Sequence, residues 1–337
     1  MKRTFLVFSA ALALAGCSRT APDTRWPPPG PAGGLPYVPL PDDADHDEST
    51  VAATPPMSVV APKAIDGTLP AQPPVVLARA HACKDKQCTL QGFVPDPSFG
   101  KAAPSGADSP GTLWLQEIAP GSVLVISRHH QLEVFALALT GSALASGDDG
   151  GAMKLDAWSA LRAPGGGVTI KAGDEGAKLV MGLAAKTGTV PSAARQAQDK
   201  PFAVRWKKRP VPLAVATLPS TQDLSWGGGA FHARIGFGAE SPIPGSWGVL
   251  LSAPGAEIKE HDHPTWEHVA VLDGTGTMQV DGQAHPVKPG SVFDLAPGVK
   301  HAFTPSGDRG LVVVQMYTPS GPEQRFVKLS AAEAAKK

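Results

Sequence analysis

The stretch GAEIKEHDHPTWEHVAVLDG, residues 255–274, decides the fold and the chemistry of this chain. It places His261 and His263 two residues apart and a carboxylate, Glu267, four residues after the second histidine. On an extended strand, residues two apart face the same side. The two histidines therefore point together toward whatever this strand lines, and Glu267 follows after a turn that Pro264 begins.

A second stretch, GSVFDLAPGVKH at residues 290–301, ends on a further histidine. Pro297 and Gly298 predict a tight turn that brings His301 back from the far side of a hairpin. Three imidazoles and a carboxylate then converge, a donor set without thiolate. If these side chains were only polar core residues, they would have to satisfy one another inside a small barrel, which is costly without a cation.

This donor set leaves two positions open on an octahedral ion. It suits Fe(II), Mn(II), Ni(II), Co(II) or Cu(II) better than a closed structural zinc site, and zinc is the remaining alternative. The sequence predicts a divalent transition metal as the cofactor, and the pattern does not choose among these ions.

The two stretches resemble the two motifs of the cupin superfamily. Residues 255–274 fit the first motif, G-x5-H-x-H-x3-E-x6-G, at every fixed position. Residues 290–301 resemble the second, G-x5-P-x-G-x2-H, with Ala296 in place of its first proline. The resemblance implies a double-stranded β-helix, or jelly roll. The metal ligands that it implies are His261, His263, Glu267 and His301, and Glu267 is also the catalytic candidate, as a base that could leave the metal.

An internal repeat extends the resemblance over roughly residues 75–330. The spacing from Gly141 to Pro164 equals that from Gly274 to Pro297, at 23 residues. This predicts two homologous β domains, a bicupin arrangement. The predicted organisation is a signal peptide at 1–17, a disordered linker at 18–74, a degenerate cupin at 75–190, a connector at 191–225, a metal-binding cupin at 226–330 and a tail at 331–337.

The first copy, residues 75–190, lacks two of the four donors. His129 and Glu133 match the second histidine and the carboxylate, but Ser127 and Val168 stand where the other two histidines should be. Two donors do not make a dependable metal site. We therefore expect the first copy to serve packing, domain pairing or ligand shaping, with a second metal centre as the alternative.

Short runs rich in Val and Leu, separated by Gly, Pro and Asp, predict strands throughout both copies. The Asp281-Gly282 pair predicts a two-residue hairpin. Helix signals are confined to the last residues, SAAEAAKK, and weakly to residues 191–200. The predicted fold class is all-β. The runs expected to form strands are 112–117, 122–127, 134–139, 178–183, 247–252, 268–272, 277–280 and 311–317.

Several side chains near the four donors are weaker candidates. His232 and Arg234 could reach the pocket as a proton donor or an anion contact, although a structural role is the stronger reading. Trp266 and His268 flank Glu267 and should face the other side of their strand. Phe303 shares a face with His301, so we expect it to line the pocket.

The first residues, MKRTFLVFSAALALAGC, read as an export signal. Lys2 and Arg3 form a positive segment, and the apolar stretch that follows is too short to span a bilayer. The final LAGC resembles the lipobox of bacterial lipoproteins, which implies acylation of Cys17. An ordinary cleaved signal is the alternative. Ser18 after the cysteine, rather than Asp, resembles the signal for release to the outer membrane, so we expect a lipid-anchored envelope protein on the periplasmic face.

The other two cysteines, Cys83 and Cys88, lie just after a segment that contains 14 prolines between residues 18 and 74. Such composition is typical of a disordered linker. In an oxidising compartment the two cysteines are expected to form a small disulfide loop. A metal or redox pair is the alternative, and it is weaker because the spacing is not C-x2-C.

Charge excludes one class of partner. The chain carries 30 basic and 30 acidic residues, so it lacks the basic surface that binding to nucleic acid requires. The expected partners are a small-molecule ligand and the membrane, and a homo-oligomer stays open. Two functions fit. One is a metal-dependent oxidoreductase, isomerase or decarboxylase of the quercetinase or oxalate type, as the resemblance implies. The other is a non-catalytic ligand-binding or envelope module.

Overall fold

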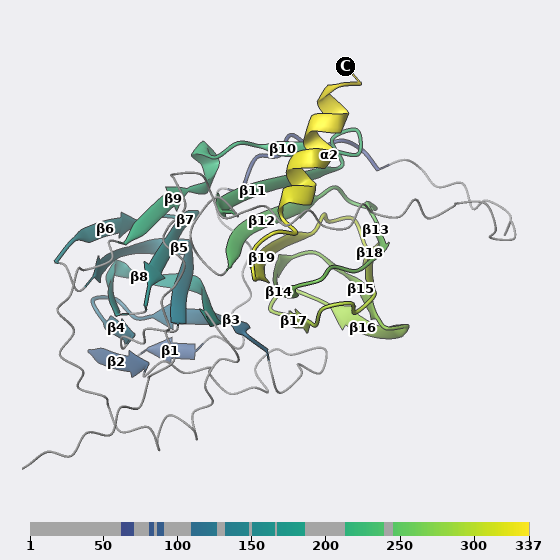
Figure 1. The fold of residues 1–337 in the computed structure, drawn as a ribbon. Helices are drawn as coiled ribbons and strands as arrows, with labels where there is room; N and C mark the ends of the chain where they lie inside the picture. Colours follow the sequence, from purple (N-terminus) through teal and green to yellow (C-terminus); the bar gives the residue numbers. More distant parts are fainter. Residues whose placement is uncertain are drawn as a thin grey trace, which may run out of the picture. The chain divides into compact units, whose positions relative to one another are not determined.

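The structure is a computed structural model that describes residues 62–70, 81–83, 86–90, 109–126, 132–147, 150–165, 167–185, 213–238 and 245–336. The described residues form β-strands, a 3₁₀ turn at Leu218–Ser220 and an α-helix, α2, at Gln324–Ala334 (Figure 1). The predicted fold class, all-β with tandem jelly rolls, is confirmed. The signal peptide with Cys17 and the weak helix signal at residues 191–200 lie outside the described residues.

The second copy is a sandwich of two sheets. One sheet has the order β10-β11-β12-β19-β14-β17 and the other the order β13-β18-β15-β16. Apolar side chains from both sheets meet in one buried cluster, which includes Leu250 and Val269 from the first sheet and Met278 and Phe303 from the second. The strands are β10 (Leu224–Trp226), β11 (Phe231–Phe237), β12 (Ser246–Ser252), β13 (Ile258–His261), β14 (Trp266–Asp273), β15 (Thr275–Val280), β16 (Gln283–Val287), β17 (Val292–Leu295), β18 (His301–Ser306) and β19 (Val312–Thr318).

The predicted hairpin at Asp281-Gly282 is confirmed. Val280 of β15 pairs with Gln283 of β16, so the loop has two residues. Both loop residues have positive φ, 46° at Asp281 and 75° at Gly282. This is the backbone of a type I′ turn, which matches the right-handed twist of the strands and which Asp-Gly adopts readily.

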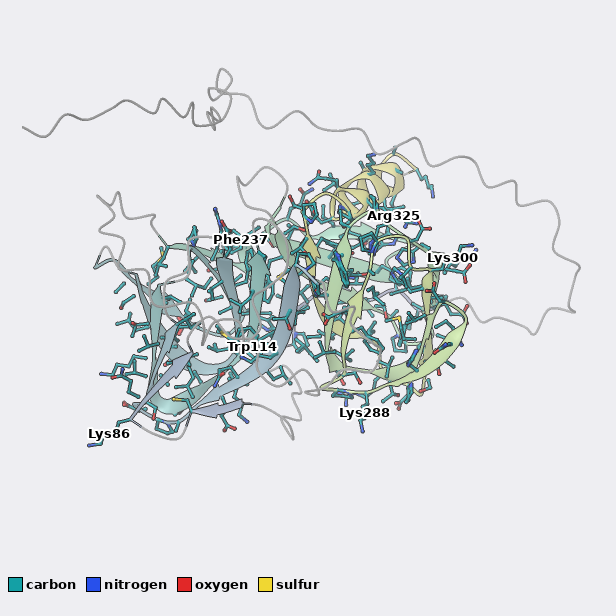
Figure 2. All side chains as sticks on the ribbon, turned by 60° about the horizontal axis from the view of Figure 1, so that its bottom comes forward. Lys86, Trp114, Phe237, Lys288, Lys300 and Arg325 are labelled. Carbon is teal, nitrogen blue, oxygen red and sulfur yellow. The ribbon has the colours of Figure 1, made fainter. Side chains whose placement is uncertain are left out.

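The first copy is a single nine-stranded sheet with a central path β1-β3-β8-β5-β7-β9. Its core holds the buried Trp114 of β3 (Figure 2) together with Ile170 and Leu179 of β8. The strands are β1 (His81–Cys83), β2 (Gln87–Leu90), β3 (Gly111–Ile118), β4 (Val123–Ile126), β5 (Leu132–Gly147), β6 (Ala152–Leu155), β7 (Ser159–Pro164), β8 (Val168–Ala185) and β9 (Ala214–Thr217).

The predicted connector contributes strands to both copies. β9 pairs with β7 of the first copy, whereas β10 pairs with β11 of the second. The two copies also share a core, because one buried cluster contains Leu137 and Val180 of the first copy and Val249 and Val314 of the second. At its centre Phe135 stacks on Trp247, with ring centroids 5.5 Å apart and planes 8° apart.

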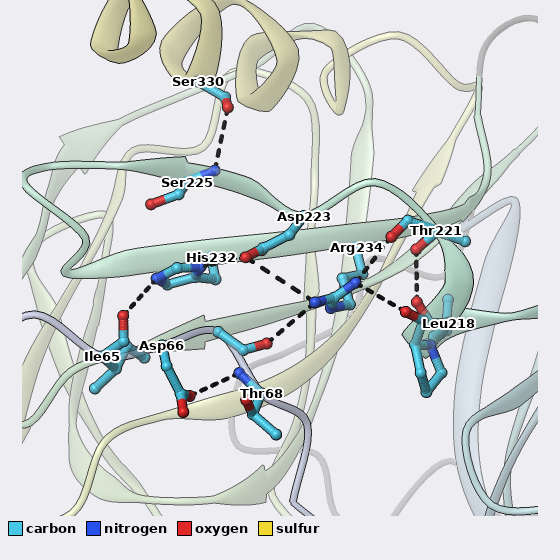
Figure 3. A network of polar contacts seen from close by, with 12 residues as sticks. Ile65, Asp66, Thr68, Leu218, Thr221, Asp223, Ser225, His232, Arg234 and Ser330 are labelled. Carbon is cyan, nitrogen blue, oxygen red and sulfur yellow. Dashed lines mark hydrogen bonds and ion pairs between the residues drawn. The ribbon is translucent and has the colours of Figure 1, made fainter. Parts of the chain in front are cut away.

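Residues 62–70, which we call the strap, also contact both copies, and Figure 3 shows the contact with the second copy. The backbone N–H of Ile65 donates to the carbonyl of Gly229 over 2.9 Å, and His232 Nε2 donates to the Ile65 carbonyl over 3.0 Å. In the first copy, Trp158 Nε1 donates to the Pro70 carbonyl over 2.7 Å. The sequence assigned this segment to the linker, so the packed chain begins earlier than its composition indicates.

Helix α2 packs on β10 of the second copy (Figure 1). Phe326 of the helix stacks on Trp226 at 5.3 Å, and Trp226 in turn stacks on Phe231 at 5.5 Å. The predicted C-terminal helix signal is therefore confirmed, although the helix begins six residues before the SAAEAAKK stretch, at Gln324. Within the described residues, none of the helices has the length and hydropathy that crossing a bilayer requires.

Candidate metal centre

The four predicted donors come from both sheets of the second copy. His261 ends β13 and pairs in register with His301, the first residue of β18. Glu267 is the second residue of β14 in the opposite sheet, and His263 lies in the short turn between β13 and β14. Because the sandwich brings these strand ends together, residues that are 40 positions apart in the sequence become neighbours, as 261 and 301 are.

Each histidine is oriented by a hydrogen bond to a backbone carbonyl two residues away. His261 Nδ1 donates to Lys259, His263 Nδ1 to Thr265 and His301 Nδ1 to Val299, each over 2.9 Å. A carbonyl can only accept, so Nδ1 carries the proton in all three rings. In the neutral rings this leaves the Nε2 lone pairs available, which is how proteins orient metal-binding histidines.

The donor atoms of these rings converge. One ring nitrogen from each of the three histidines lies within 4.8 Å of the others. Oε2 of Glu267 lies 3.0 Å from His263 Nε2 and 3.2 Å from His301 Nε2. The His263, His301 and Glu267 side chains are at least nine-tenths buried, at 8%, 5% and 4% exposed. The geometry therefore gathers the three histidines and places the Glu267 carboxylate against two of them, His263 and His301.

The second carboxylate oxygen of Glu267 is held by two residues of β19. Gln315 Nε2 donates to Oε1 over 2.7 Å and the Tyr317 hydroxyl donates to it over 3.1 Å. Tyr317 pairs directly with Glu267 across the two strands. Sequence reasoning missed both residues. The only signal for them is that Val313, Gln315 and Tyr317 alternate along one face of a strand.

The electrostatics couple the four donors. Burial and then the charge of His301 lower the pKa of His261 to about 4. Burial acts to lower the pKa of His301, but the hydrogen bond and charge of Glu267 outweigh it and raise that pKa. Burial acts to raise the pKa of Glu267, yet the hydrogen bonds and charges of His263 and His301 hold that pKa well below its usual value. Burial and then the charge of Glu267 raise the pKa of Tyr317 well above its usual value.

These residues fit a divalent transition metal. A carboxylate oxygen and three imidazole nitrogens with bound Nδ1 protons are all acceptors, and acceptors brought this close need a proton or a cation among them. Imidazole and carboxylate ligands without thiolate suit first-row transition metals. Oε1 of Glu267 and the three Nδ1 atoms each have a hydrogen-bond partner, as the corresponding atoms of metal ligands in proteins usually do.

The other sequence candidates do not join the four donors. His232 is buried, with Nδ1 3.0 Å from Asp223 and Nε2 bonded to the strap, so its role is structural. Arg234 donates to the Thr221 carbonyl over 2.8 Å on the same outer side (Figure 3). Figure 3 also shows Asp66 accepting from the Thr68 backbone over 2.9 Å, which folds the strap locally.

The residues that flank Glu267 face away from it, as the strand period requires. His268 is fully buried, and its ring nitrogens lie 2.7 Å from Asp294 Oδ1 and 3.0 Å from the Thr318 hydroxyl. Trp266 stacks on His268 at 6.3 Å. Phe303 is buried on the inner side of its sheet, among the core residues of the second copy.

In the first copy, the carboxylate equivalent to Glu267 is Glu133, and its surroundings differ. Glu133 pairs across strands with Ala184 and Pro164, as Glu267 pairs with Tyr317 and Leu295. Arg162 Nε lies 3.4 Å from Glu133 Oε2, so a guanidinium supplies positive charge to this carboxylate. Val168 is buried in the core. Ser127 and His129 lie outside the described residues.

The predicted disulfide stays a prediction. Cys83 ends β1 and is 2% exposed, with its sulfur 3.7 Å from the Val123 carbonyl. The side chain of Cys88, in β2, lies outside the described residues.

Comparisons with known proteins bear on both ends of the chain. A family model described as a cupin domain matches residues 248–317, and one described as a prokaryotic membrane lipoprotein lipid attachment site matches residues 1–18. A search of curated proteins found no match. A solved structure of a Bacillus subtilis oxalate decarboxylase variant is 15% identical with a TM-score of 0.48, over 63% of this chain and 70% of that one. A structure of protein Ylba from E. coli is 14% identical with a TM-score of 0.46, over 62% and 77%.

The cupin match contains the four predicted donors, His261, His263, Glu267 and His301, and both motifs quoted above. The lipoprotein match ends one residue after Cys17 and supports a lipid-anchored protein of the cell envelope. Residues 248–317 therefore form a cupin domain, and residues 1–18 match a lipoprotein lipid attachment site.

Proposed function

We propose that this chain is a lipid-anchored metalloprotein whose second copy binds one divalent transition metal through His261, His263, Glu267 and His301. The observation that carries the proposal is that one ring nitrogen from each of three histidines lies within 4.8 Å of the others, while each ring is oriented through Nδ1. Iron, manganese, nickel, cobalt, copper and zinc all accept this donor set. Elemental analysis decides among them.

The activity that this site supports best is that of a metal-dependent oxidoreductase or isomerase for a small oxygen-bearing organic acid, enol or sugar. A bound metal would act as a Lewis acid that polarises a ligand oxygen. The chain's own contribution is a carboxylate poised next to that oxygen. Glu267 could leave the metal and accept a proton, while Gln315 and Tyr317 keep its outer oxygen in place.

A non-catalytic ligand-binding module is the second candidate. The first copy favours this candidate. There Arg162 lies beside Glu133, and the buried Val168 stands where a ligand histidine would be, so the first copy contributes packing and not a metal site. In either case the anchor at Cys17 holds the protein in the envelope. We assign it to the periplasmic face of the outer membrane because Ser18 follows the cysteine, and self-association remains part of the proposal.

The metal assignment is tested on the full chain purified in detergent. Wild-type protein should contain close to one transition metal ion per chain, and the double variant His263→Ala, His301→Ala should contain none. His285→Ala is the matched control, because His285 lies on β16 away from the four donors. Metal retained by the double variant would refute the assigned ligands.

The catalytic proposal is tested separately by oxygen consumption and product analysis with flavonols, small dicarboxylates and keto acids. Turnover that disappears in Glu267→Gln supports an enzyme. Metal-replete protein that leaves the whole panel unchanged, while binding some of its members, favours the binding module.

A further inference from the structure

One buried histidine, His232 in β11, takes no part in the proposed metal chemistry and contacts the strap instead. Its side chain is 6% exposed. Nδ1 lies 3.0 Å from both carboxylate oxygens of Asp223, and Nε2 lies 3.0 Å from the backbone carbonyl of Ile65 (Figure 3). The ring therefore connects a carboxylate of the second copy to the backbone of the strap.

Both ring nitrogens of His232 face acceptors. A backbone carbonyl and an ionised carboxylate accept hydrogen bonds and cannot donate them. A neutral imidazole has one N–H and can satisfy only one of these partners, whereas an imidazolium has two. His232 can make both contacts together only when the ring is doubly protonated and carries a positive charge.

The loss of one proton from this ring acts on the strap. The hydrogen bond to Asp223 joins an N–H to a carboxylate, and such bonds are about twice as strong as those between neutral groups. The remaining proton therefore stays on Nδ1. Nε2 then presents a lone pair to the Ile65 carbonyl at 3.0 Å, so that two acceptors face each other and the bond to the strap is lost.

Within the second copy, the charged neighbours of His232 are Asp223 and Arg234. Arg234 Nη2 lies 4.0 Å from Asp223 Oδ2, and its positive charge opposes protonation of the histidine. His232 is nearer to this carboxylate, at 3.0 Å from both oxygens. Direct contact with the carboxylate favours the imidazolium in spite of the guanidinium.

The strap contributes two charged residues, Asp66 and Lys63, and both are exposed. The hydrogen bonds from Thr68, and to a smaller extent the charge of His232, lower the pKa of Asp66. Aspartate ordinarily loses its proton near about pH 4, whereas histidine changes charge between about pH 5 and pH 8. Over the latter range, the group of this cluster that changes charge is His232.

We propose that His232 is a proton-dependent latch for the start of the strap, residues 62–66. The doubly protonated ring holds this segment on the second copy through the Ile65 carbonyl, and loss of a proton releases it. The inference does not depend on the proposed metal site, because it involves none of the four candidate ligands.

The rest of the strap is held by groups that do not titrate over this range. Arg234 donates to the Gly67 carbonyl over 3.5 Å, and Trp158 Nε1 donates to the Pro70 carbonyl over 2.7 Å. Leu69 is 7% exposed and belongs to the core that both copies share. Release should therefore be local and should not undock the whole strap.

Hydrogen exchange of the full chain in detergent, resolved by residue with mass spectrometry, tests the latch. The reporter is the backbone N–H of Ile65, which donates to the Gly229 carbonyl over 2.9 Å. Its protection is its exchange rate divided into the intrinsic chemical rate at each pH, from about pH 5.5 to about pH 8.5. The N–H of Val271, which donates to Ser291 within the second copy, reports any opening of the whole fold.

In wild-type protein the protection of Ile65 should fall by about tenfold as the pH rises over this range, equivalent to about 1.4 kcal/mol, while that of Val271 stays constant. In His232→Gln the protection of Ile65 should not depend on pH. In Asp223→Asn the fall should move to lower pH, because the imidazolium loses its counter-charge. His285→Gln, in the opposite sheet, is the matched control and should behave like wild type.

Protection of Ile65 that is independent of pH in wild-type protein would overturn the inference, and so would protection that rises with pH. An equal pH dependence in His232→Gln and wild type would assign the effect to another group. If His232→Gln does not fold, Asp223→Asn decides, because an unchanged midpoint in that variant would show that the carboxylate does not control the latch.

Discussion

Each candidate ligand histidine uses one ring nitrogen for the fold and leaves the other for a ligand. The carbonyls that accept from Nδ1 lie two residues away in the same segment, at Lys259, Thr265 and Val299. Ring orientation therefore depends on local backbone and not on distant packing. Glu267 is different, because its orientation depends on β19, a strand that begins 45 residues later at Val312.

Removing the residues that hold Glu267 should weaken metal binding without removing a ligand. We predict that Gln315→Ala and Tyr317→Phe each reduce metal affinity by about 10-fold to 100-fold, since outer partners of metal ligands commonly contribute that much. Competition with a chelator of known affinity measures the metal affinity of each variant. Gln279→Ala, on the neighbouring sheet, is the control, and unchanged affinity in both test variants would show that Glu267 needs neither partner.

Metal affinity should also depend on pH through His301. Its raised pKa means that the ring holds a proton at a pH where an ordinary histidine is neutral, and a metal has to displace that proton. Affinity is therefore greatest above this pKa and should fall by about tenfold per pH unit below it, over a range that begins above the ordinary histidine pKa of 6.5. His261, with a pKa of about 4, stays neutral over this range. Titration of the bound metal at fixed ionic strength measures the slope, and a flat profile would contradict the prediction.

At the scale of elements, the features that depend on a few adjacent residues could be predicted from the sequence. The pairing between strands that are distant in the sequence could not. The Asp281-Gly282 turn follows from two adjacent residues, and the structure has it. His261 and His263 do come together as predicted, although β13 ends at His261 and His263 lies in the turn that follows. The pairing of Glu267 with Tyr317 follows from how β14 and β19 align, which no local pattern encodes.

The strap escaped prediction because its composition is that of a linker. Pro62 and Pro70 bound it, and its apolar residues, Ile65 and Leu69, show no strand or helix period. Its stability comes from contacts with residues far away in the sequence. Ile65 pairs with Gly229 and His232, and Leu69 joins the core that both copies share.

A truncation series tests what the strap contributes. Protein that begins at Pro62 should be as stable as the full mature chain, whereas protein that begins at Val75 should lose about 3 kcal/mol. Burial of a leucine contributes about 1.5–3 kcal/mol and each hydrogen bond about 1 kcal/mol. Urea denaturation monitored by circular dichroism gives both values. Equal stability of the two truncations would show that the strap contributes nothing.

A point variant should reproduce part of this loss. Gly67 has φ of +69°, and a Cβ there would lie 2.2 Å from Nδ1 of His232, which is buried and bonded on both sides. We predict that Gly67→Ala destabilises the chain that begins at Pro62 and brings its stability closer to that of the chain that begins at Val75. Gly282→Ala is the control for glycine loss alone, because a Cβ there meets nothing. Full stability of Gly67→Ala would show that the strap docks differently.

At the scale of the molecule, the shared core connects the first copy to the candidate metal site in the second copy. Phe135 of the first copy stacks on Trp247 of β12. β12 pairs with β19, and Tyr317 of β19 donates a hydrogen bond to Glu267. We predict a single unfolding transition whose midpoint rises when metal binds, because a ligand that binds only the native state stabilises everything that unfolds with it.

Trp247→Ala should lower the free energy of unfolding by about 3–5 kcal/mol and split the transition in two. Calorimetry with and without metal measures this, and a metal-independent transition in wild-type protein would show that the copies unfold separately.

The predicted lipid anchor lies outside the part of the chain that the structure describes. The lipid attachment site occupies residues 1–18, whereas the strap, where the described chain begins, starts at Pro62. Acyl chains on Cys17 should therefore hold the protein at a membrane without affecting the metal site, since each buried methylene contributes about 0.8 kcal/mol to membrane binding. Cys17→Ser should move the protein from the membrane fraction to the soluble fraction while its metal content per folded chain stays the same. Cys17→Ser protein that stays in the membrane fraction would place the attachment elsewhere, and loss of metal on release would show that the site depends on the membrane.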